Sequence, residues 1–487
     1  RSATGLFFLA SMENPGITFS RKFLFVILPF VYQMGGAKLL NPQQSEAVAR
    51  YNSSSVPAFV IEAPPGSGKT FTAAAMAVSY KGRGVQLFLS TANVPVLNMA
   101  LALDQLDYGS RSPLHLLSSE FEDKLTEENS SPFSALTLAK TQESLRVKIE
   151  ELEGYLEYAV NEEERKELRK DIRRVCGPVL DEEHDIYFAT VDSILKRFFK
   201  PNKGGSHYVD TIKKLLTEKV ERVVIDEASQ LTESALNALV LCFPQAQIVL
   251  IGDPKQLSPF NYDEDKIVCQ MAARSALDVV KEKKNVPVVK LRKVYRASPD
   301  LIDHYSKVFY DGKLESCKNE SRENPLSCFG TRSGGSRCLF WRVKNGHCRQ
   351  DGTSKYNDAE ITALNYIVMT LRFAGISEKD VLVISYYEAQ RKRAEEKLKR
   401  LSSGYECLTV DSAQGREKKI VIVLTTRTSV PTDKGSFFTD PKRCNVAVSR
   451  HQEALIVLGH PSIAAAPNWT QILSSKHVRH VDDDRAR

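Results

Sequence analysis

Short runs of apolar, mostly β-branched residues recur along the chain and constrain its fold more than any other feature. Each run is bounded by turn residues, and helical stretches separate the runs. They are FVIEA at 59–63, QLFLS at 86–90, IYFAT at 186–190, VVID at 223–226, IVLIGD at 248–253, VLVIS at 381–385, IVIVLTT at 420–426 and ALIVLGH at 454–460. Continuous apolar runs of this kind are typical of parallel strands that are buried on both faces. Their alternation with helices predicts a doubly wound α/β architecture.

The runs form two groups, one before and one after about residue 287, which predicts two α/β lobes in tandem. A chain of 487 residues is long enough for more than one domain. We expect the first lobe at residues 40–286 and the second lobe at 287–470. An N-terminal extension at 1–39 and a polar C-terminal tail at 471–487 complete the expected organisation.

A charge-dense segment at about residues 110–183 interrupts the first lobe. It contains the string LRVKIEELEGYLEYAVNEEERKELRKDIRR, which has no proline and no run typical of a strand. Such a string predicts one or two exposed helices. We interpret the segment as a solvated helical insertion, and an arm that closes over a ligand is the alternative.

The N-terminal extension contains an apolar run, FLFVILPFVY at 23–32, directly after Arg21 and Lys22. A membrane-spanning helix needs about 20 apolar residues, so this run is too short to cross a bilayer. It is either a buried strand or short helix, or the core of a signal peptide. The nine cysteines form an odd set without a CxxC pair, which favours a reducing compartment. We therefore expect a protein of the cytoplasm or nucleus without a membrane span.

The string APPGSGKT, Ala63 to Thr70, follows the first apolar run and fits a phosphate-binding loop. Glycines let backbone N–H groups surround phosphate oxygens, and the N-terminus of the following helix adds positive potential. In this role Lys69 would reach the β- and γ-phosphates of ATP, and the Thr70 hydroxyl would bind Mg²⁺. The residues expected to bind the nucleotide phosphates are Pro65, Gly66, Ser67, Gly68, Lys69 and Thr70.

Two further motifs end apolar runs, at the sheet edge where α/β proteins bind their ligands. In VVIDEASQ, Asp226 is expected to hold Mg²⁺, and Glu227 is expected to orient and deprotonate the attacking water. A solvated acidic start of a helix is the alternative for this pair. In GDPKQLSP, the Gln256 amide is expected to sense a γ-phosphate, although the same string also fits a simple turn.

Two arginines of the second lobe are candidates for a direct role in hydrolysis. They are Arg296, in VYRASPDLI, and Arg450, in NVAVSRHQ. Transfer of a γ-phosphoryl group requires positive charge near its oxygens, and arginine side chains supply such charge. If both arginines reach the nucleotide, ATP binding would close the two lobes and hydrolysis would release them. A surface salt bridge is the alternative for either residue.

Taken in order along the chain, these strings resemble the motifs of superfamily 1 helicases, and most closely the branch of the up-frameshift helicases and senataxin. The resemblance covers about residues 40–463. The ordered set is LNPQQ at 40–44, APPGSGKT at 63–70, DEASQ at 226–230, GDPKQL at 252–257, YR at 295–296, TVDSAQGRE at 409–417 and NVAVSR at 445–450. It implies two RecA-like P-loop lobes, ATP hydrolysis, and translocation along a single strand, generally 5′ to 3′.

The resemblance also implies further site residues. Gln44 is similar to the glutamine that reads adenine, and Gly415 and Glu417 are similar to the motif that couples nucleotide to nucleic acid. The residues implied to contact nucleic acid are Asn93, Thr190, Tyr387 and Thr409. The implied partner is single-stranded nucleic acid, with RNA favoured over DNA, and the net charge of +7 allows a polyanion. A monomer is the expected state, and regulatory protein partners are left open.

The sequence departs from the family pattern at five positions. Val294 stands where the family has Gln, Lys419 where it has Asp, and Tyr386 where it has Pro; His451 and Gln452 replace Ala and a basic residue. None of these changes removes a residue of the expected nucleotide site. Three of them, Val294, Lys419 and His451, motivate one alternative function, a nucleic-acid-binding clamp with weak or lost ATP turnover. The other alternative is a P-loop NTPase switch without a nucleic-acid role.

Overall fold

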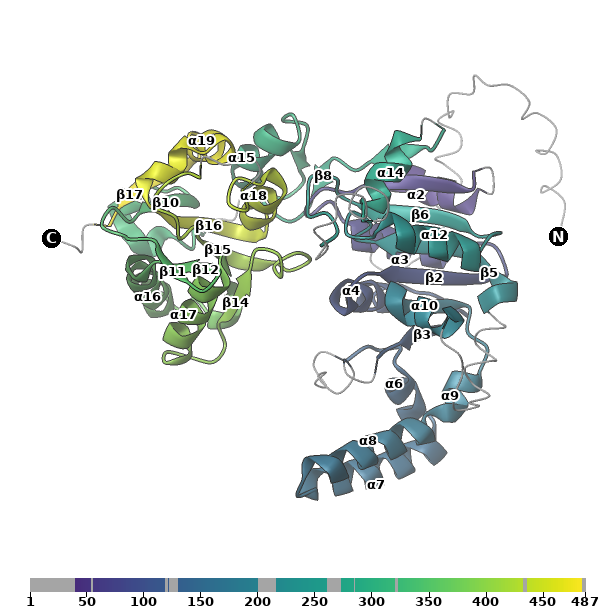
Figure 1. The fold of residues 1–487 in the computed structure, drawn as a ribbon. Coiled ribbons are helices and arrows are strands. Elements are labelled where there is room, and N and C mark those ends of the chain that lie inside the picture. Colours follow the sequence, from purple (N-terminus) through teal and green to yellow (C-terminus); the bar gives the residue numbers. More distant parts are fainter. Residues whose placement is uncertain are drawn as a thin grey trace.

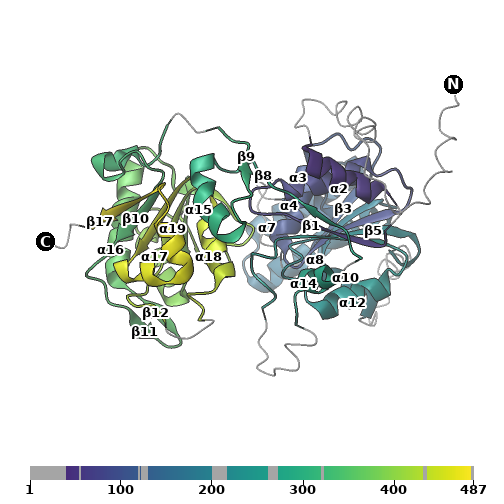
Figure 2. The same cartoon turned by 90° about the horizontal axis from the view of Figure 1, so that it is seen from above.

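The computed structural model describes residues 40–53, 56–118, 121, 130–199, 216–260, 273–283, 285–319, 323–431 and 436–483. These residues form two lobes that lie side by side, each a parallel β-sheet with helices on both faces (Figures 1 and 2). The prediction of two doubly wound α/β lobes in tandem is therefore confirmed. The apolar run at 23–32 lies outside the described residues. Within the described ranges, no helix has both the length and the apolar character that crossing a membrane requires.

The first lobe contains a seven-stranded parallel sheet in the order β3-β4-β2-β5-β6-β1-β7. The strands are β1 (Ala58–Glu62), β2 (Val85–Ser90), β3 (Pro113–Leu116), β4 (Ile186–Thr190), β5 (Val220–Asp226), β6 (Gln247–Gly252) and β7 (Val288–Lys290). The helices around it are α2 (Pro42–Asn52), α3 (Lys69–Ser79), α4 (Asn93–Asp104), α10 (Val191–Phe199), α12 (Glu233–Cys242) and α14 (Ala276–Glu282). Successive strand residues point to opposite faces. Thus Phe59 packs with α2, α3 and α4, whereas Val60 packs with α10, α12 and α14.

The second lobe contains a six-stranded parallel sheet in the order β14-β13-β15-β16-β10-β17. The strands are β10 (Cys338–Arg342), β13 (Val381–Ser385), β14 (Glu406–Thr409), β15 (Lys418–Leu424), β16 (His451–Gly459) and β17 (Val478–Asp482). The helices are α15 (Pro299–Phe309), α16 (Asp358–Phe373), α17 (Glu388–Lys399), α18 (Pro441–Val448) and α19 (Pro467–Leu473). Leu382 of β13 packs with α15, α18 and α19, and the next residue, Val383, packs with α16 and α17.

Short elements connect these parts. The pair β8 (Lys293–Val294) and β9 (Glu315–Ser316) lies between the lobes in Figure 1, and β11 (Arg349–Asp351) pairs with β12 (Ser354–Tyr356) in the second lobe. Three 3₁₀ helices are η2 (Ser327–Arg332), η3 (Glu378–Asp380) and η4 (Pro461–Ala465).

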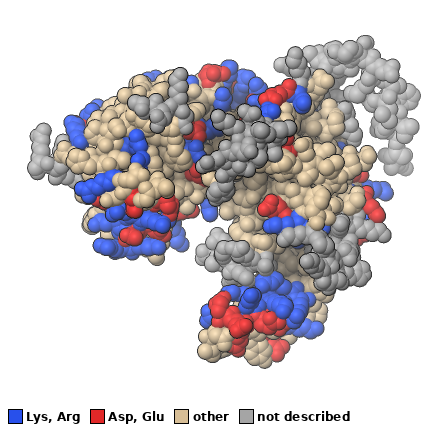
Figure 3. Space-filling view, in the orientation of Figure 1, with Lys and Arg blue, Asp and Glu red and all other residues tan. Residues whose placement is uncertain are grey.

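The charged insertion is helical and projects from the first lobe (Figure 1). It consists of α6 (Ala135–Lys140), α7 (Glu143–Tyr158), α8 (Glu162–Val175) and α9 (Gly177–Asp181), placed between β3 and β4. The helices share a small apolar cluster that includes Ile149 of α7 and Ile172 of α8 and is separate from the main cores. Acidic and basic side chains crowd the visible surface of the hairpin formed by α7 and α8 (Figure 3). The prediction of a solvated helical insertion is confirmed.

Three strands lie outside the boundaries that we expect from the sequence. β7 pairs with β1, so the first sheet extends beyond residue 286. β17 pairs with β10, so the expected tail at 471–487 contains an edge strand of the second sheet. β3 pairs with β4, so the range 110–183 begins with sheet and not with the insertion. Each of these strands is short and lies at a sheet edge, and polar residues interrupt each of them, so none gives a continuous apolar run.

Candidate active site

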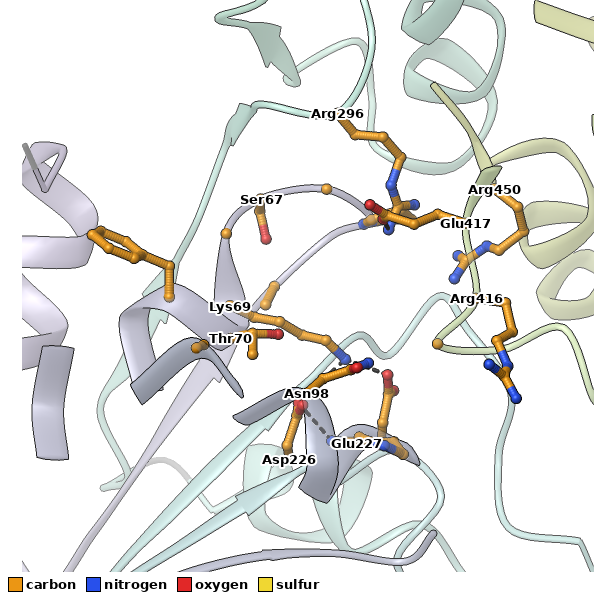
Figure 4. Close-up of a pocket in the computed structure, with 18 of the residues that line it drawn as sticks. Ser67, Lys69, Thr70, Asn98, Asp226, Glu227, Arg296, Arg416, Glu417 and Arg450 are labelled. Carbon is orange, nitrogen blue, oxygen red and sulfur yellow. Dashed lines mark hydrogen bonds and ion pairs between the residues drawn. The ribbon is translucent and has the colours of Figure 1, made fainter. Parts of the chain in front are cut away.

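A cavity of about 650 Å³ lies at the interface of the two lobes, beyond the carboxyl ends of β1 and β5 (Figure 4). The first lobe contributes the loop from Ala63 to Phe71 together with Asp226, Glu227 and Gln256. The connection between the lobes contributes Tyr295 and Arg296, and the second lobe contributes Gly415, Arg416, Glu417 and Arg450. The structure therefore brings the expected phosphate loop, acidic pair, amide and both arginines to one cavity.

The loop from Ala63 to Thr70 forms a cradle that only glycine fits at two positions. Gly66 and Gly68 have φ values of 72° and 77°, in the left-handed region. A Cβ on Gly66 would lie 2.5 Å from Cβ of Arg296. The Ser67 hydroxyl is buried and has no hydrogen-bond partner among the described residues. The loop therefore presents an unpaired hydroxyl donor, that of Ser67, and backbone without side chains at Gly66 and Gly68 beside the cavity. Helix α3 begins immediately afterwards, at Lys69.

Lys69 pairs with both carboxylates of the DEAS motif. Its ammonium contacts Oε1 of Glu227 and lies 3.2 Å from Oδ1 of Asp226. Burial alone lowers the pKa of Lys69, but the two carboxylates outweigh burial and raise it above the ordinary value. Burial raises the pKa of Asp226, with Lys69 opposing the shift. For Glu227, Lys69 and Gln414 overcome the effect of burial and hold the pKa below its usual value. Glu227 is therefore ionised at neutral pH.

Glu227 is held in an unusual backbone conformation by contacts from both lobes. Its φ is 54°, which a non-glycine residue adopts only at a cost of about 1–3 kcal/mol. Nε2 of Gln414, in the second lobe, donates to Oε2 of Glu227 at 2.8 Å. Nε2 of Gln230 in turn donates to Oε1 of Gln414 at 2.8 Å. Sequence reasoning missed Gln230 and Gln414 as site residues, although both stand inside the quoted motifs.

Arg450 reaches the first lobe from the end of α18. Its Nη2 donates to Oε1 of Gln256 at 3.1 Å and to the Ser449 hydroxyl at 2.8 Å. Burial lowers the pKa of Arg450 to about 10, and the neighbouring Arg296 adds to the shift. The guanidinium therefore remains charged at neutral pH, beside the groups where negative charge would gather. The alternative of a surface salt bridge does not hold for Arg450, which is 2% exposed.

Arg296 is anchored between the connection and the second lobe. It forms an ion pair with Glu417, and its Nη1 donates to the carbonyl oxygen of Ser449 at 2.6 Å. Nε2 of Gln452 donates to the other oxygen of Glu417 at 2.9 Å. Glu417 thus orients an arginine of the cavity wall, and Gln452 in turn orients Glu417.

A second group of polar residues lies beside the phosphate-binding loop. Nε2 of Gln44 donates to the carbonyl oxygen of Ser67 at 3.4 Å. Nδ2 of Asn41 donates to the Tyr295 hydroxyl at 2.9 Å, and Tyr295 is 43% exposed. Sequence reasoning missed Tyr295 as a lining residue, although it adjoins Arg296 in the YR motif. Asn98 of α4 also lines the cavity, and it belongs to none of the sequence motifs quoted above.

The four residues implied to contact nucleic acid lie outside this cavity. Thr190 ends β4, and Asn93 begins α4 shortly after β2, the neighbouring strand. Thr409 ends β14, and Tyr387 follows β13, the neighbouring strand of the second sheet. The Thr409 hydroxyl accepts from the backbone N–H of Ser412 at 3.3 Å, so it also closes a turn. Each pair therefore lies at adjacent carboxyl ends of its own sheet.

The departures from the family pattern mostly lie away from the cavity. Lys419 forms an ion pair with Asp380 at 2.9 Å on the surface. Tyr386 and His451 are buried in the second lobe. Val294 is buried and packs against the phosphate-binding loop. A Cβ added at Gly66 of this loop would lie 3.3 Å from Cγ1 of Val294.

The fold and the cavity together define a two-lobed P-loop protein with a candidate nucleotide site between its lobes. Two family models, both described as an AAA domain, match residues 175–324 and 272–462. Uncharacterized ATP-dependent helicase C05C10.2 of Caenorhabditis elegans is 35% identical over 267 residues, which cover 52% of this chain and 17% of that protein. A regulator of nonsense transcripts 1 homolog of Arabidopsis thaliana is 27% identical and covers 92% of this chain and 35% of its own length.

ATP-dependent helicase NAM7 of Saccharomyces cerevisiae is also 27% identical, over 92% of this chain and 44% of its own length. The similarity to these relatives agrees with the resemblance to up-frameshift-like superfamily 1 helicases that the ordered motifs carry. The chain spans less than half the length of each of these three relatives. Among solved structures, an arterivirus nonstructural protein 10 helicase aligns with a TM-score of 0.39 at 13% identity, over 86% of this chain and 62% of that chain. So low a score bears on neither fold nor function.

Proposed function

We propose that the chain hydrolyses ATP between its two lobes and uses the cycle to move along single-stranded nucleic acid or to unwind duplexes. The observation that carries this proposal is the composition of the cavity wall. Lys69 and Glu227 come from one lobe, and Arg450 comes from the other. A nucleotide bound there would contact both lobes, so its hydrolysis would change how strongly the lobes hold each other. The names of the relatives, which include two ATP-dependent helicases, support the same activity.

ATP and Mg²⁺ are the ligands that the cavity fits. The buried Ser67 hydroxyl and the glycine backbone offer donors to phosphate oxygens. The Thr70 hydroxyl and the Asp226 carboxylate both line the cavity and are oxygen ligands of the kind that Mg²⁺ prefers. When bound, the ion would neutralise charge on the β- and γ-phosphates. The half-exposed ring of Tyr295, close to Gln44, offers a face for the adenine base.

Each remaining side chain takes one step of the proposed hydrolysis. Lys69 would hold the γ-phosphate by exchanging its carboxylate partners for phosphate oxygens. Glu227 would orient the attacking water and accept its proton. Arg450 and Arg296 would stabilise the charge that develops on the γ-phosphoryl oxygens. Gln256 would contact the γ-phosphate and change the position of Arg450, to which it is already hydrogen-bonded.

We place the nucleic-acid strand across the carboxyl edges of both sheets. Asn93 and Thr190 would contact it in the first lobe, and Tyr387 and Thr409 in the second. Hydroxyl and amide groups at strand ends bind phosphates without reading sequence, so binding would be independent of sequence and sensitive to salt. RNA is the favoured strand, and a monomer of the cytoplasm or nucleus is part of the same proposal.

The experiment that tests the function is ATP hydrolysis by the purified chain, alone and with single-stranded RNA or DNA. Strong stimulation by one strand type would support the motor and identify its substrate. Tight strand binding with a flat, low hydrolysis rate would favour the clamp. A high rate that strands do not change would favour an NTPase switch.

Replacement of Arg450 by alanine is expected to lower kcat about 10³-fold while nucleotide still binds, because the developing charge loses a buried cation. Strand-stimulated hydrolysis measures kcat, and titration with a fluorescent ATP analogue measures binding. Arg372→Ala is the matched control, since Arg372 lies exposed on α16 and donates to the carbonyl oxygen of Leu401. A variant that loses its cooperative thermal unfolding would show instead that Arg450 is needed for the fold.

A further inference from the structure

Tyr310 joins the two lobes through a buried polar contact that the proposed chemistry does not use. This residue follows α15 of the second lobe, and its hydroxyl donates to Oδ2 of Asp253 at 2.5 Å. Asp253 belongs to the first lobe, directly after β6, and is 3% exposed. The same hydroxyl accepts from Nδ2 of Asn445 at 2.7 Å. The Tyr310 hydroxyl is therefore engaged both as donor and as acceptor.

Asp253 connects this hydroxyl to the amide of Gln256. Its Oδ2 also accepts from Nε2 of Gln256 at 2.8 Å, and its Oδ1 accepts from the backbone N–H of Lys255 at 2.9 Å. Because the amide nitrogen of Gln256 is bound to Asp253, the amide oxygen must point away from it. That oxygen accepts from Nη2 of Arg450 at 3.1 Å. Four side chains thus form one chain of hydrogen bonds from Tyr310 to Arg450.

The chain of hydrogen bonds closes on itself through α18. Nδ2 of Asn445, on this helix, donates to the carbonyl oxygen of Lys255 at 2.9 Å as well as to Tyr310. Nε of Arg450 donates to the carbonyl oxygen of Val446, on the same helix, at 3.2 Å. Both ends of the chain therefore rest on one rigid element of the second lobe, while its middle belongs to the first lobe.

We propose that Tyr310 is a positioning residue for ATP hydrolysis, whose hydroxyl fixes Asp253 and thereby aligns Gln256 with Arg450 across the lobe interface. The inference rests on the proposed function, since it assigns a role in the same reaction. Tyr310 touches no substrate in this scheme and acts only through Asp253.

The protonation states support this assignment. Burial raises the pKa of Tyr310 well above its ordinary value, so the hydroxyl keeps its proton and remains a donor. Burial also raises the pKa of Asp253, and the hydrogen bonds from Tyr310 and Gln256 oppose that shift. Loss of the Tyr310 hydroxyl therefore removes one of the interactions that oppose the rise in the pKa of Asp253.

Tyr310→Phe tests the proposal, because it removes the hydroxyl and keeps the ring. We expect strand-stimulated kcat to fall about tenfold, the factor that corresponds to one lost hydrogen bond to a charged acceptor. The KM for ATP should change little, since the groups that bind the phosphates are untouched. Tyr305→Phe is the matched control. Tyr305 lies on α15, shortly before Tyr310, and is buried, but its hydroxyl has no hydrogen-bond partner in the described ranges.

A double-mutant cycle separates positioning from general packing. Asp253→Asn alone should also lower kcat, and Tyr310→Phe should have little further effect in that background, because the two residues act through one contact. Additive losses, or a Tyr310→Phe protein as active as wild type and Tyr305→Phe, would overturn the inference while the proposed function stands. A wild-type chain without ATP hydrolysis would overturn the proposed function and this inference with it.

Discussion

Replacement of Lys69 by alanine is expected to abolish ATP hydrolysis, with a loss in kcat of about 10³-fold or more. Lys69 begins α3, directly after the glycine cradle, and is the cation of the first lobe that lines the cavity beside Asp226 and Glu227. Without its ammonium, two adjacent buried carboxylates face the phosphates with no neutralising charge from this lobe. Release of phosphate from ATP at saturating single strand measures the effect.

The structure also supplies controls for this variant. Lys81→Ala removes an exposed lysine just beyond the same helix and should leave kcat unchanged. Lys69→Arg keeps a positive charge and should bind nucleotide more strongly than the alanine variant, although the wider guanidinium does not reproduce the ammonium. Full activity of a folded Lys69→Ala protein would contradict the assignment of this cavity as the ATP site.

Replacement of Glu227 by glutamine is expected to stop turnover while leaving ATP bound. The amide keeps the size of the carboxylate but cannot accept a proton from water, and loss of such a base costs about 10²–10⁴-fold in rate. Since Lys69 and Gln414 hold the pKa of Glu227 below its usual value despite burial, the wild-type carboxylate is ionised at neutral pH.

Two measurements check the glutamine variant. Titration with a fluorescent ATP analogue should give an affinity similar to wild type, and phosphate release should be at the level of the Lys69→Ala protein. Glu218→Gln is the matched control, because Glu218 is exposed at the opposite end of β5 from Glu227. Unchanged phosphate release by Glu227→Gln would transfer the role of base to another group.

The part of the site within the first lobe is predictable from the sequence, because its residues are close together along the chain or end apolar runs. Gly66, Lys69, Asp226 and Glu227 are examples. A strand followed by a glycine loop and a helix places its donors locally, whatever the rest of the chain does. The acidic pair is predictable for a related reason, since the carboxyl ends of parallel strands meet at one edge.

The contacts between the lobes are not predictable in the same way. Tyr310 and Asp253 are separated by 57 residues, and Gln414 and Glu227 by 187. Their meeting depends on how two separate sheets approach each other, which no periodicity encodes. The short edge strands β3, β7 and β17 escape prediction for a different reason. They are only three to five residues long, and polar residues interrupt them, as in VRHVD at 478–482.

The contacts in the structure also show which of the residues that differ from the family pattern lie near the candidate site. The reversed charge of Lys419 finds a partner in Asp380, on the surface. Gln452 replaces a basic residue and donates to Glu417, which holds Arg296. Only Val294, packed against Gly66, touches the phosphate loop directly among the departures. Of the three substitutions that motivate the clamp hypothesis, Val294 therefore carries more weight than Lys419 and His451.

The position of the α7–α8 hairpin has a consequence for how such chains diversify. The hairpin is part of the connection between β3 and β4, two adjacent parallel strands, and such a connection can have any length that returns the chain to the next strand. Because the hairpin packs around its own small apolar cluster, its removal leaves the two cores of the first lobe intact. This connection is therefore an attachment point at which evolution or protein engineering can exchange one accessory module for another without redesigning the two sheets and their cores.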